Sequence, residues 1–219
     1  MINLKYCTHN RQPFFEIASK YIKAESIVLD IGSGNGDFAE FHKRNDFFMF
    51  DGNIQTVDYL KTKYRNVYHG ILPVLPFKNE TFDIIHCSHV VEHLEPVQLY
   101  NSIKEMDRCL KKDGYLIISA PLLWEGFYDD MSHVKPYPPN VFKNYLASKS
   151  NAPRTREKIS INYSVKEEIY RFLVYKPFEG ISRSENNIYV KIFFRILKLI
   201  EKTGVRKYKK TGFTIVLQK

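Results

Sequence analysis

Short apolar runs alternate with stretches of helical periodicity along the first 121 residues. Runs rich in β-branched and aromatic residues predict strands at 27–31, 47–50, 66–69, 82–87 and 115–119. Apolar positions spaced three or four residues apart predict amphipathic helices at 12–23, 38–44 and 96–110. The last helix is expected to start at Pro96 and to stop at a turn over 111–114, where two lysines precede Gly114. Strands that alternate with helices predict a parallel sheet with helices on both faces.

The pattern changes after Pro121. Residues 121–140 are rich in proline and have few periodic apolar positions, which predicts a long loop. Further elements are expected as a helix at 140–149, one long strand or a hairpin at 159–176, and a last strand at 212–217. We therefore expect residues 1–219 to form one α/β domain with an insertion after the fifth strand.

A basic amphipathic helix is predicted at 188–202. Its apolar side holds Ile192, Phe193, Ile196, Leu199 and Ile200. Its cations lie largely on the other side, at Lys191, Arg195, Lys198 and Lys202. The favoured interpretation is a helix that covers the sheet or closes a pocket. The alternative is docking on an anionic membrane surface.

Composition and charge narrow the class of protein. The 219 residues are 44% hydrophobic, which excludes a disordered chain, and no apolar stretch is long enough to span a membrane. The start of the chain lacks the apolar core of a secretory signal, and Cys7, Cys87 and Cys109 are far apart, so we expect a reducing, cytoplasmic setting. The net charge of +9 favours anionic partners such as phosphate, nucleic acid or an acidic membrane, although a merely solubilising surface is the alternative.

A glycine loop follows the first predicted strand, in the sequence Val-Leu-Asp-Ile-Gly-Ser-Gly-Asn-Gly at 28–36. Glycines let the backbone turn sharply and approach a ligand closely. The pattern is GxGxG and not the GxGxxG of dinucleotide sites. Asp30, two residues before the first glycine, suits a ligand with a cationic amino group and disfavours a pyrophosphate. Ligands of such sheets bind at the carboxyl ends of the strands, so this loop is a candidate site.

This loop resembles the first motif of class I S-adenosylmethionine-dependent methyltransferases. Further motifs of that family occur in the same order, at Phe50–Gly52, Leu75–Phe77, Thr81–Ile85, Val91–Leu94 and Leu110–Leu116. The resemblance covers residues 25–121 and is to the type-11, UbiE-like group. It implies a Rossmann-like fold with a mainly parallel seven-stranded sheet, S-adenosylmethionine as cofactor and methyl transfer as reaction. It makes 1–121 the cofactor-binding half and 122–219 the acceptor side.

The resemblance also implies which residues bind the cofactor. They are Asp30, Gly32, Ser33, Gly34, Asp51, Gly52, Ile71, Leu72, Cys87 and Ser88. Gly32 and Gly34 would lie against the methionine part, Asp51 would accept hydrogen bonds from the ribose, and the last two would line the methyl-donor pocket through their backbone. Ile71 departs from the family pattern, because an acid that reads the adenine amine often stands at this position.

Three histidines are candidate catalytic bases on the acceptor side, namely His89, His93 and His133, because histidine accepts protons near neutral pH. Residues 130–137 resemble a segment of methyltransferases that act on sugars and cell-surface polysaccharides. The sequence therefore predicts O-methylation of a sugar, or of a phosphorylated or lipid-linked glycan. The partner would be an anionic small-molecule or glycan acceptor, with peripheral membrane contact as a further expectation.

Two other functions remain open at this point. Ubiquinone-biosynthesis and small-RNA 2′-O-methyltransferases, which this chain also resembles, bind a divalent metal through an ExxEH segment. His89 stands where their first Glu would be, which argues against a metal, and no metal ligands are assigned. The net charge and this cluster nevertheless make RNA ribose methylation the second prediction. A noncatalytic cofactor-binding protein is the third, supported only by Ile71. The sequence leaves the oligomeric state undetermined.

Overall fold

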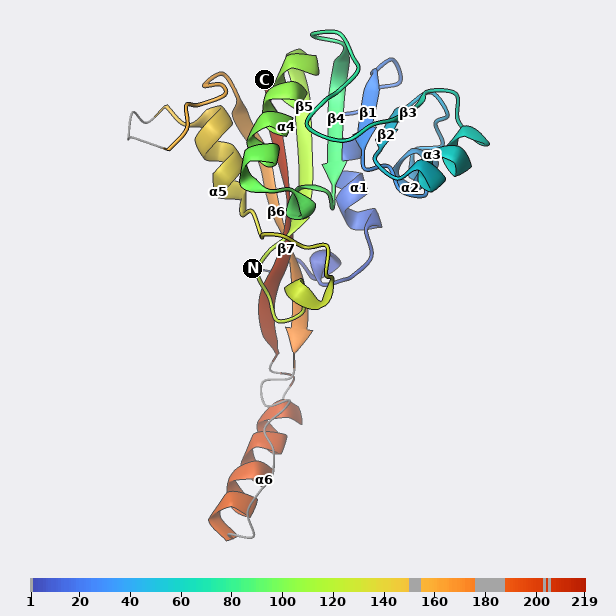
Figure 1. Cartoon of the computed structure of the whole chain (residues 1–219). Helices are drawn as coiled ribbons and strands as arrows, with labels where there is room; N and C mark the ends of the chain where they lie inside the picture. The colour runs from blue at the N-terminus through green and yellow to red at the C-terminus, as the bar shows by residue number, and fades with distance from the viewer. Residues whose placement is uncertain (1, 150–154, 176–187, 203, 205) are drawn as a thin grey trace.

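Seven strands form one sheet in the order β3-β2-β1-β4-β5-β7-β6 (Figure 1). The structure is a computed structural model that describes residues 2–149, 155–175, 188–202, 204 and 206–219. The strands are β1 (Val28–Ile31), β2 (Phe48–Asp51), β3 (Val67–His69), β4 (Phe82–Ser88), β5 (Leu110–Pro121), β6 (Ser164–Tyr175) and β7 (Lys207–Gln218). The pairs among β1 to β5 are all parallel, and β7 runs antiparallel to both β5 and β6. The predicted seven-stranded, mainly parallel α/β sheet is confirmed.

Helices cover both faces of this sheet. They are α1 (Gln12–Ser19), α2 (Asp37–Phe41), α3 (Ile54–Lys61), α4 (Pro96–Cys109) and α5 (Pro139–Phe142), while α6 (Ile188–Lys202) lies away from the sheet. Shorter turns are η1 (Leu4–Tyr6), η2 (Val91–His93), η3 (Phe127–Asp129) and η4 (Lys143–Ala147). Consecutive strand residues point to opposite faces, so Ile84 packs with the helices α1 to α3 and Ile85 packs with α4 and α5. Two buried cores result, one on each side of the sheet.

The end of α4 differs from the expectation. The helix stops at Cys109, and residues 110–114 already belong to β5 instead of forming a helical cap. Leu110 pairs with Phe82 of β4, Asp113 donates its N–H to the carbonyl of Lys219 at 3.1 Å, and Lys219 donates back to Gly114 at 3.0 Å. Pairing with neighbouring strands therefore takes the backbone groups that a cap would have used.

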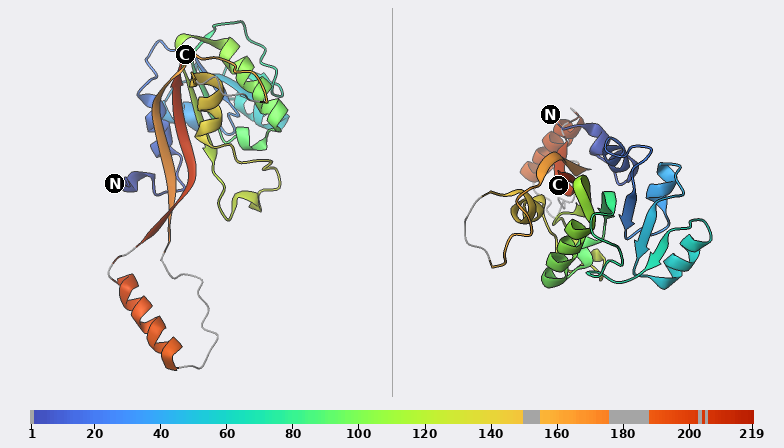
Figure 2. Two further views of the ribbon diagram at one scale, coloured as in Figure 1. Left: turned by 90° about the vertical axis from the view of Figure 1, so that its left-hand side faces the viewer. Right: turned by 90° about the horizontal axis from the view of Figure 1, so that it is seen from above.

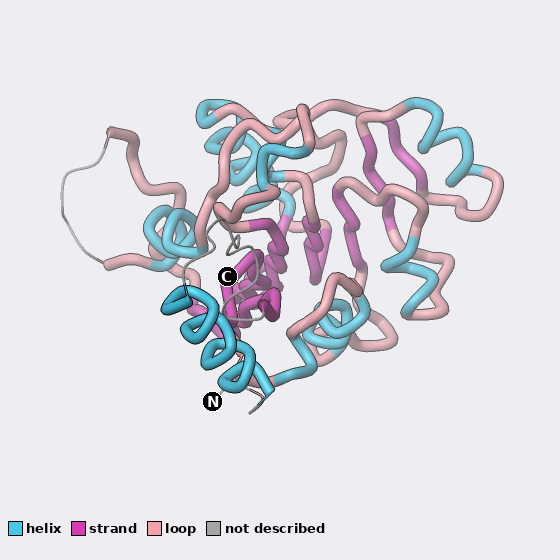
Figure 3. Tube along the Cα trace, turned by 90° about the horizontal axis from the view of Figure 1, so that it is seen from below, coloured by secondary structure: helices cyan, strands magenta, loops and turns pink. Residues whose placement is uncertain are grey.

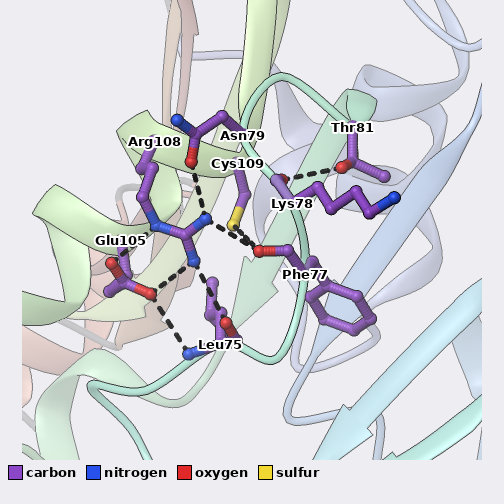
Figure 4. A network of polar contacts seen from close by, with 8 residues as sticks. All are labelled: Leu75, Phe77, Lys78, Asn79, Thr81, Glu105, Arg108 and Cys109. Carbon is purple, nitrogen blue, oxygen red and sulfur yellow. Dashed lines mark hydrogen bonds and ion pairs between the residues drawn. The ribbon is translucent and has the colours of Figure 1, made fainter.

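Arg108 of α4 fixes the loop between β3 and β4 (Figure 4). Its guanidinium donates to the carbonyls of Phe77 at 2.7 Å and Leu75 at 3.1 Å. Glu105, one turn earlier on the helix, accepts from the same guanidinium at 2.7 and 2.8 Å and from the Leu75 N–H at 3.3 Å. The Leu-Pro-Phe segment seen in the sequence is thus held by a fork of charge-assisted hydrogen bonds.

The last two strands extend beyond the rest of the sheet and carry α6 away from it (Figures 1 and 2). β5 pairs with β7 only as far as Gly212, whereas β6 and β7 continue to pair out to Tyr175 and Lys207. The helix lies beyond this two-stranded extension and does not cover the sheet, so the favoured interpretation of 188–202 is wrong (Figures 1 and 2). Seen from below, α6 lies in front of the strands (Figure 3). No helix within the described residues has the length and apolar character needed to cross a membrane.

Candidate functional site

The glycine loop lies at the carboxyl end of β1, where the backbone takes conformations that only glycine adopts without strain. Gly32, Gly34 and Gly36 have φ angles of 70°, 52° and 85°. A Cβ atom on Gly32 would lie 2.1 Å from a methyl carbon of Val90, whereas one on Gly34 would meet nothing within 4 Å. The first glycine therefore permits close packing against the segment after β4, and the second leaves space for a ligand.

A polar cavity of about 260 Å³ opens beside this loop. Its walls include Arg11 at the start of α1, Asp30 of β1, Ser33 and Gly34 of the loop, and Ser88 at the end of β4. A cation and carboxyl groups share one small space, which suits the amino and carboxylate groups of an amino acid. The cavity has the chemistry for the methionine end of a nucleoside cofactor.

A buried acid–histidine pair forms the floor of the cavity. Asp30 and His86 are partners in the register of β1 and β4, and their side chains meet at 2.7 Å between Oδ1 and Nδ1. Both residues are 3% exposed. The His86 ring also stacks on Phe38 of α2, with ring centres 3.7 Å apart. Packing and hydrogen bonding together fix the position of the Asp30 carboxyl group.

Asp51 ends β2 and reaches across to the glycine loop. One carboxylate oxygen accepts the N–H of Gly34 at 3.0 Å, and the other accepts the N–H of Asn53 at 2.9 Å. Each oxygen keeps a lone pair free, so the group can accept from two neighbouring hydroxyls. At the end of β3, Ile71 is 68% exposed while Leu72 is buried.

The second part of the site follows β4. His89 has a φ of 57°, and its N–H is held by the carbonyl of Ser119 at 2.9 Å. Its Nδ1 lies 3.2 Å from Oε1 of Glu92, a residue with no exposed surface. Burial lowers the pKa of His89 below the ordinary histidine value, against the opposing effect of Glu92. At neutral pH the imidazole is therefore uncharged.

The loop after β5 brings the third predicted histidine to this place. The N–H groups of Val134 and Lys135 donate to the carbonyl of Glu92 at 2.8 and 3.2 Å. The rings of His93 and His133 consequently lie 5.0 Å apart. Ligand atoms of Glu92 and both of these histidines lie within 4.8 Å of one another. The structure thus groups His93 and His133 with Glu92, and Glu92 also contacts His89.

Comparisons with known proteins agree with this geometry. Residues 29–118 match the family model described as "Methyltransferase domain". The chain resembles two uncharacterized proteins of Methanocaldococcus jannaschii, at 35% identity over 44% of this chain and at 29% over 65%. It spans 41% and 52% of their lengths. A methyltransferase structure from Archaeoglobus fulgidus, dependent on S-adenosylmethionine, matches with a TM-score of 0.63 at 22% identity, covering 99% of this chain and 97% of that one.

Residues 29–118 are similar to the methyltransferase domain family, and the whole chain has the fold of a solved S-adenosylmethionine-dependent methyltransferase. The match begins in β1 and ends in β5, so it contains the glycine loop, Asp51 and the His89–His93 segment. The acceptor-side loop with His133 lies outside the match.

Three polar residues at or near the candidate site were not predicted from the sequence. Arg11 lines the cavity and His86 pairs with Asp30. Arg171 of β6 is half-buried, and the charges of Arg11 and Glu92 act on its guanidinium. His86 could have been suspected, because a histidine within an apolar strand needs a polar partner. Of the predicted residues, Cys87 is buried and burial raises the pKa of its thiol, while Ser88 lines the cavity.

Proposed function

We propose that this methyltransferase domain transfers the methyl group of S-adenosylmethionine to a hydroxyl of an anionic glycan. The observation that carries the proposal is the position of the histidine cluster, which follows the same strand end that supplies Ser88 to the cofactor cavity. The cofactor residues named from the sequence would act as that resemblance implies. The His133 segment, with its likeness to sugar methyltransferases, supports a sugar hydroxyl as acceptor.

His89 is the proposed base. The acceptor oxygen attacks the methyl carbon, the bond between that carbon and sulfur breaks, and the electron pair stays on sulfur as S-adenosylhomocysteine forms. The hydroxyl proton passes to Nε2 of His89, because Nδ1 faces Glu92 at 3.2 Å. His93 and His133 lie beside Glu92 and would face the acceptor. Holding donor and acceptor in line supplies much of the rate.

A partly buried arginine supports an anionic acceptor. Burial and the nearby charge of Arg11 lower the pKa of Arg171 to about 10, and the buried Nε of Arg171 has no hydrogen-bond partner. The guanidinium lies over the ring of Phe14, 4.6 Å from its centre. A partly buried cation without a full set of partners favours a bound anion such as a phosphate or carboxylate on the acceptor.

We further propose that α6 holds the enzyme on an anionic membrane, where a lipid-linked glycan would lie. Tyr189, Ile192, Phe193, Ile196 and Leu199 are 48% to 78% exposed on this outlying helix. The helix sequence also carries four cations, which complement acidic lipid headgroups. The double variant Ile192→Glu, Phe193→Glu should abolish co-sedimentation with phosphatidylglycerol vesicles at an unchanged melting temperature. Equal sedimentation of both proteins would refute this contact.

Calorimetric titration with S-adenosylhomocysteine tests the cofactor site first. Asp51→Ala should weaken binding more than tenfold, because a charge-assisted hydrogen bond contributes about 1.5–3 kcal/mol. Asp58→Ala removes a carboxylate from the exposed side of α3 and serves as the matched control. Unchanged affinity of Asp51→Ala would disprove the pocket assignment.

Activity measurements then separate the acceptor hypotheses. Methyl transfer should be seen with phosphorylated or lipid-linked glycans, and His89→Gln should lower turnover while leaving S-adenosylhomocysteine affinity intact. Transfer to the ribose of an RNA oligonucleotide, with affinity that falls steeply with salt, would move the assignment to RNA. Cofactor binding without transfer to any acceptor would support a noncatalytic protein. Full activity of His89→Gln would exclude this base.

A further inference from the structure

We infer that Glu92, His93 and His133 form a binding site for one first-row divalent metal cation. The three residues come from η2 and from the loop after η3, so 40 positions of sequence separate the last two. Their ligand atoms lie within 4.8 Å of one another at the carboxyl end of the sheet. A search of the described residues for three or more His, Cys, Asp or Glu side chains close enough to share an ion finds this group.

The Glu92 carboxylate points to a cation. The residue has no exposed surface, and neither Oε1 nor Oε2 has a hydrogen-bond partner. A buried carboxylate without donors is costly, because it loses water and gains nothing in return. Nδ1 of His89 lies 3.2 Å from Oε1 but does not meet hydrogen-bond geometry. A bound metal ion would supply the missing positive charge.

The hydrogen bonds of the two histidines fit the role of metal ligands. Nδ1 of His93 contacts the carbonyl of Ser132 at 3.1 Å, and Nδ1 of His133 contacts the carbonyl of Phe127 at 2.5 Å. A carbonyl only accepts, so both Nδ1 atoms carry the proton and both Nε2 atoms keep a free lone pair. Metal-binding histidines use this same arrangement, in which a backbone acceptor orients the ring.

The surrounding polar groups reinforce this arrangement. Ser132 Oγ lies 3.0 Å from His93 Nδ1 and donates its own proton to Asp130 at 2.6 Å. Asp130 Oδ2 also lies 3.9 Å from His133 Nε2, on the exposed side of the cluster. Two imidazoles and one carboxylate are a donor set that proteins use for Zn²⁺ and Fe²⁺, with coordination positions left open. Mg²⁺ prefers an all-oxygen set, so the chemistry favours a transition metal.

On the proposed function, such a cation would hold the acceptor oxygen and make its hydroxyl more acidic. Its absence would not prevent S-adenosylhomocysteine binding, since the cofactor cavity uses other residues. Metal binding and cofactor binding can therefore be measured separately. A protein that binds S-adenosylhomocysteine but no metal would disprove the metal site and leave the methyltransferase assignment intact. A protein that binds metal but no S-adenosylhomocysteine would do the opposite.

The test uses full-length protein without a polyhistidine tag, stripped with EDTA and dialysed. Titration with MnCl₂, followed by the paramagnetic resonance signal of free Mn²⁺, should show one site that ZnCl₂ displaces. Glu92→Gln, His93→Gln and His133→Gln should each weaken Mn²⁺ binding at least tenfold. His9→Gln removes an exposed histidine near the N-terminus and should bind as the wild type does.

Calorimetry with S-adenosylhomocysteine shows which variants keep the fold, and those with wild-type affinity are compared for Mn²⁺. Wild-type protein that binds neither Mn²⁺ nor Zn²⁺ at one per chain would overturn the inference. So would folded variants at Glu92 and His133 that bind Mn²⁺ as tightly as the wild type. Saturating Zn²⁺ should also raise the melting temperature of the wild type but not of His133→Gln, and an equal rise in both proteins would contradict the site.

Discussion

Two buried carboxyl groups at the carboxyl edge of the sheet have opposite surroundings. Asp30 lies in the wall of the polar cavity, where His86 meets it at 2.7 Å. Glu92 lies beside His93 and His133, is at least as deeply buried, and has no hydrogen-bond partner on either oxygen. A buried carboxylate that is hydrogen-bonded to a neighbour stabilises the shape of a pocket wall. A buried carboxylate without a hydrogen-bond partner can still bind a ligand. We therefore expect Asp30 to contribute to stability and Glu92 to contribute to ligand binding.

Gly32→Ala should have the largest effect, because it disturbs both regions at once. The new Cβ would need a left-handed backbone and would lie 2.1 Å from Val90, which precedes the segment with Glu92. We expect a loss of about 3 kcal/mol, shared between unfolding free energy and cofactor affinity. Urea denaturation and calorimetry with S-adenosylhomocysteine measure the two parts. Gly204→Ala, also at positive φ but with nothing within 4 Å of its Cβ, is the control that separates clash from backbone strain.

Asp30→Ala tests the satisfied acid. Removal of this carboxyl leaves the buried Nδ1 of His86 without its partner, which should cost about 2 kcal/mol of unfolding free energy. The double variant with His86→Phe should recover part of this loss, because the ring can keep its stacking on Phe38. Stability equal to the wild type in Asp30→Ala would show that the pair contributes nothing.

In the presence of EDTA, Glu92→Gln should not lower the unfolding free energy as Asp30→Ala does. The substitution keeps the size of the side chain and removes a buried charge that has no hydrogen-bond partner. We expect the unfolding free energy to stay level or to rise by about 1 kcal/mol. Urea denaturation in EDTA measures it. A loss as large as that of Asp30→Ala would mean that the two acids do not differ as described.

His42 provides the smallest expected effect, behind the satisfied pair. Burial lowers the pKa of His42 below its ordinary value, although the Phe38 carbonyl opposes the shift. The unfolded chain therefore binds this proton more readily, so stability is complete above about pH 6.5 and falls as the pH drops further. Unfolding free energies at pH 7.5 and 5.5 should differ less in His42→Gln than in the wild type. Identical slopes would exclude this contribution.

Local sequence patterns predicted the first half of the fold well. The run at 82–87 became β4 and the glycine loop kept its place after β1, because apolar runs and glycines act within a few residues. The sequence pattern predicted all 15 residues of α6 but not its position, since periodicity defines which side of a helix is apolar and not what covers it. The length of β7 was underestimated, because Lys207–Lys210 pair with β6 despite their charge.

The candidate site was predicted in its motifs but not in its contacts. Asp51 and the glycine loop could be named as candidates because short motifs carry them. His86 was missed because its partner lies 56 residues away and is fixed only by strand register. The nearness of His93 to His133 likewise depends on the main-chain bonds from Val134 and Lys135, which side-chain patterns do not reveal.

Those main-chain bonds also bear on how new specificities arise. The loop after β5 is anchored to the carbonyls of Glu92 and Leu94, the second of which accepts the hydroxyl of Tyr137 at 2.8 Å. A carbonyl is present at every residue, so these anchors tolerate sequence change on the η2 side. The family match ends at residue 118, before this loop begins. We therefore expect that this loop can be replaced by the corresponding loop of a relative that keeps the tyrosine hydroxyl. The replacement should change the preference for the acceptor and leave the structure of residues 1–121 unchanged.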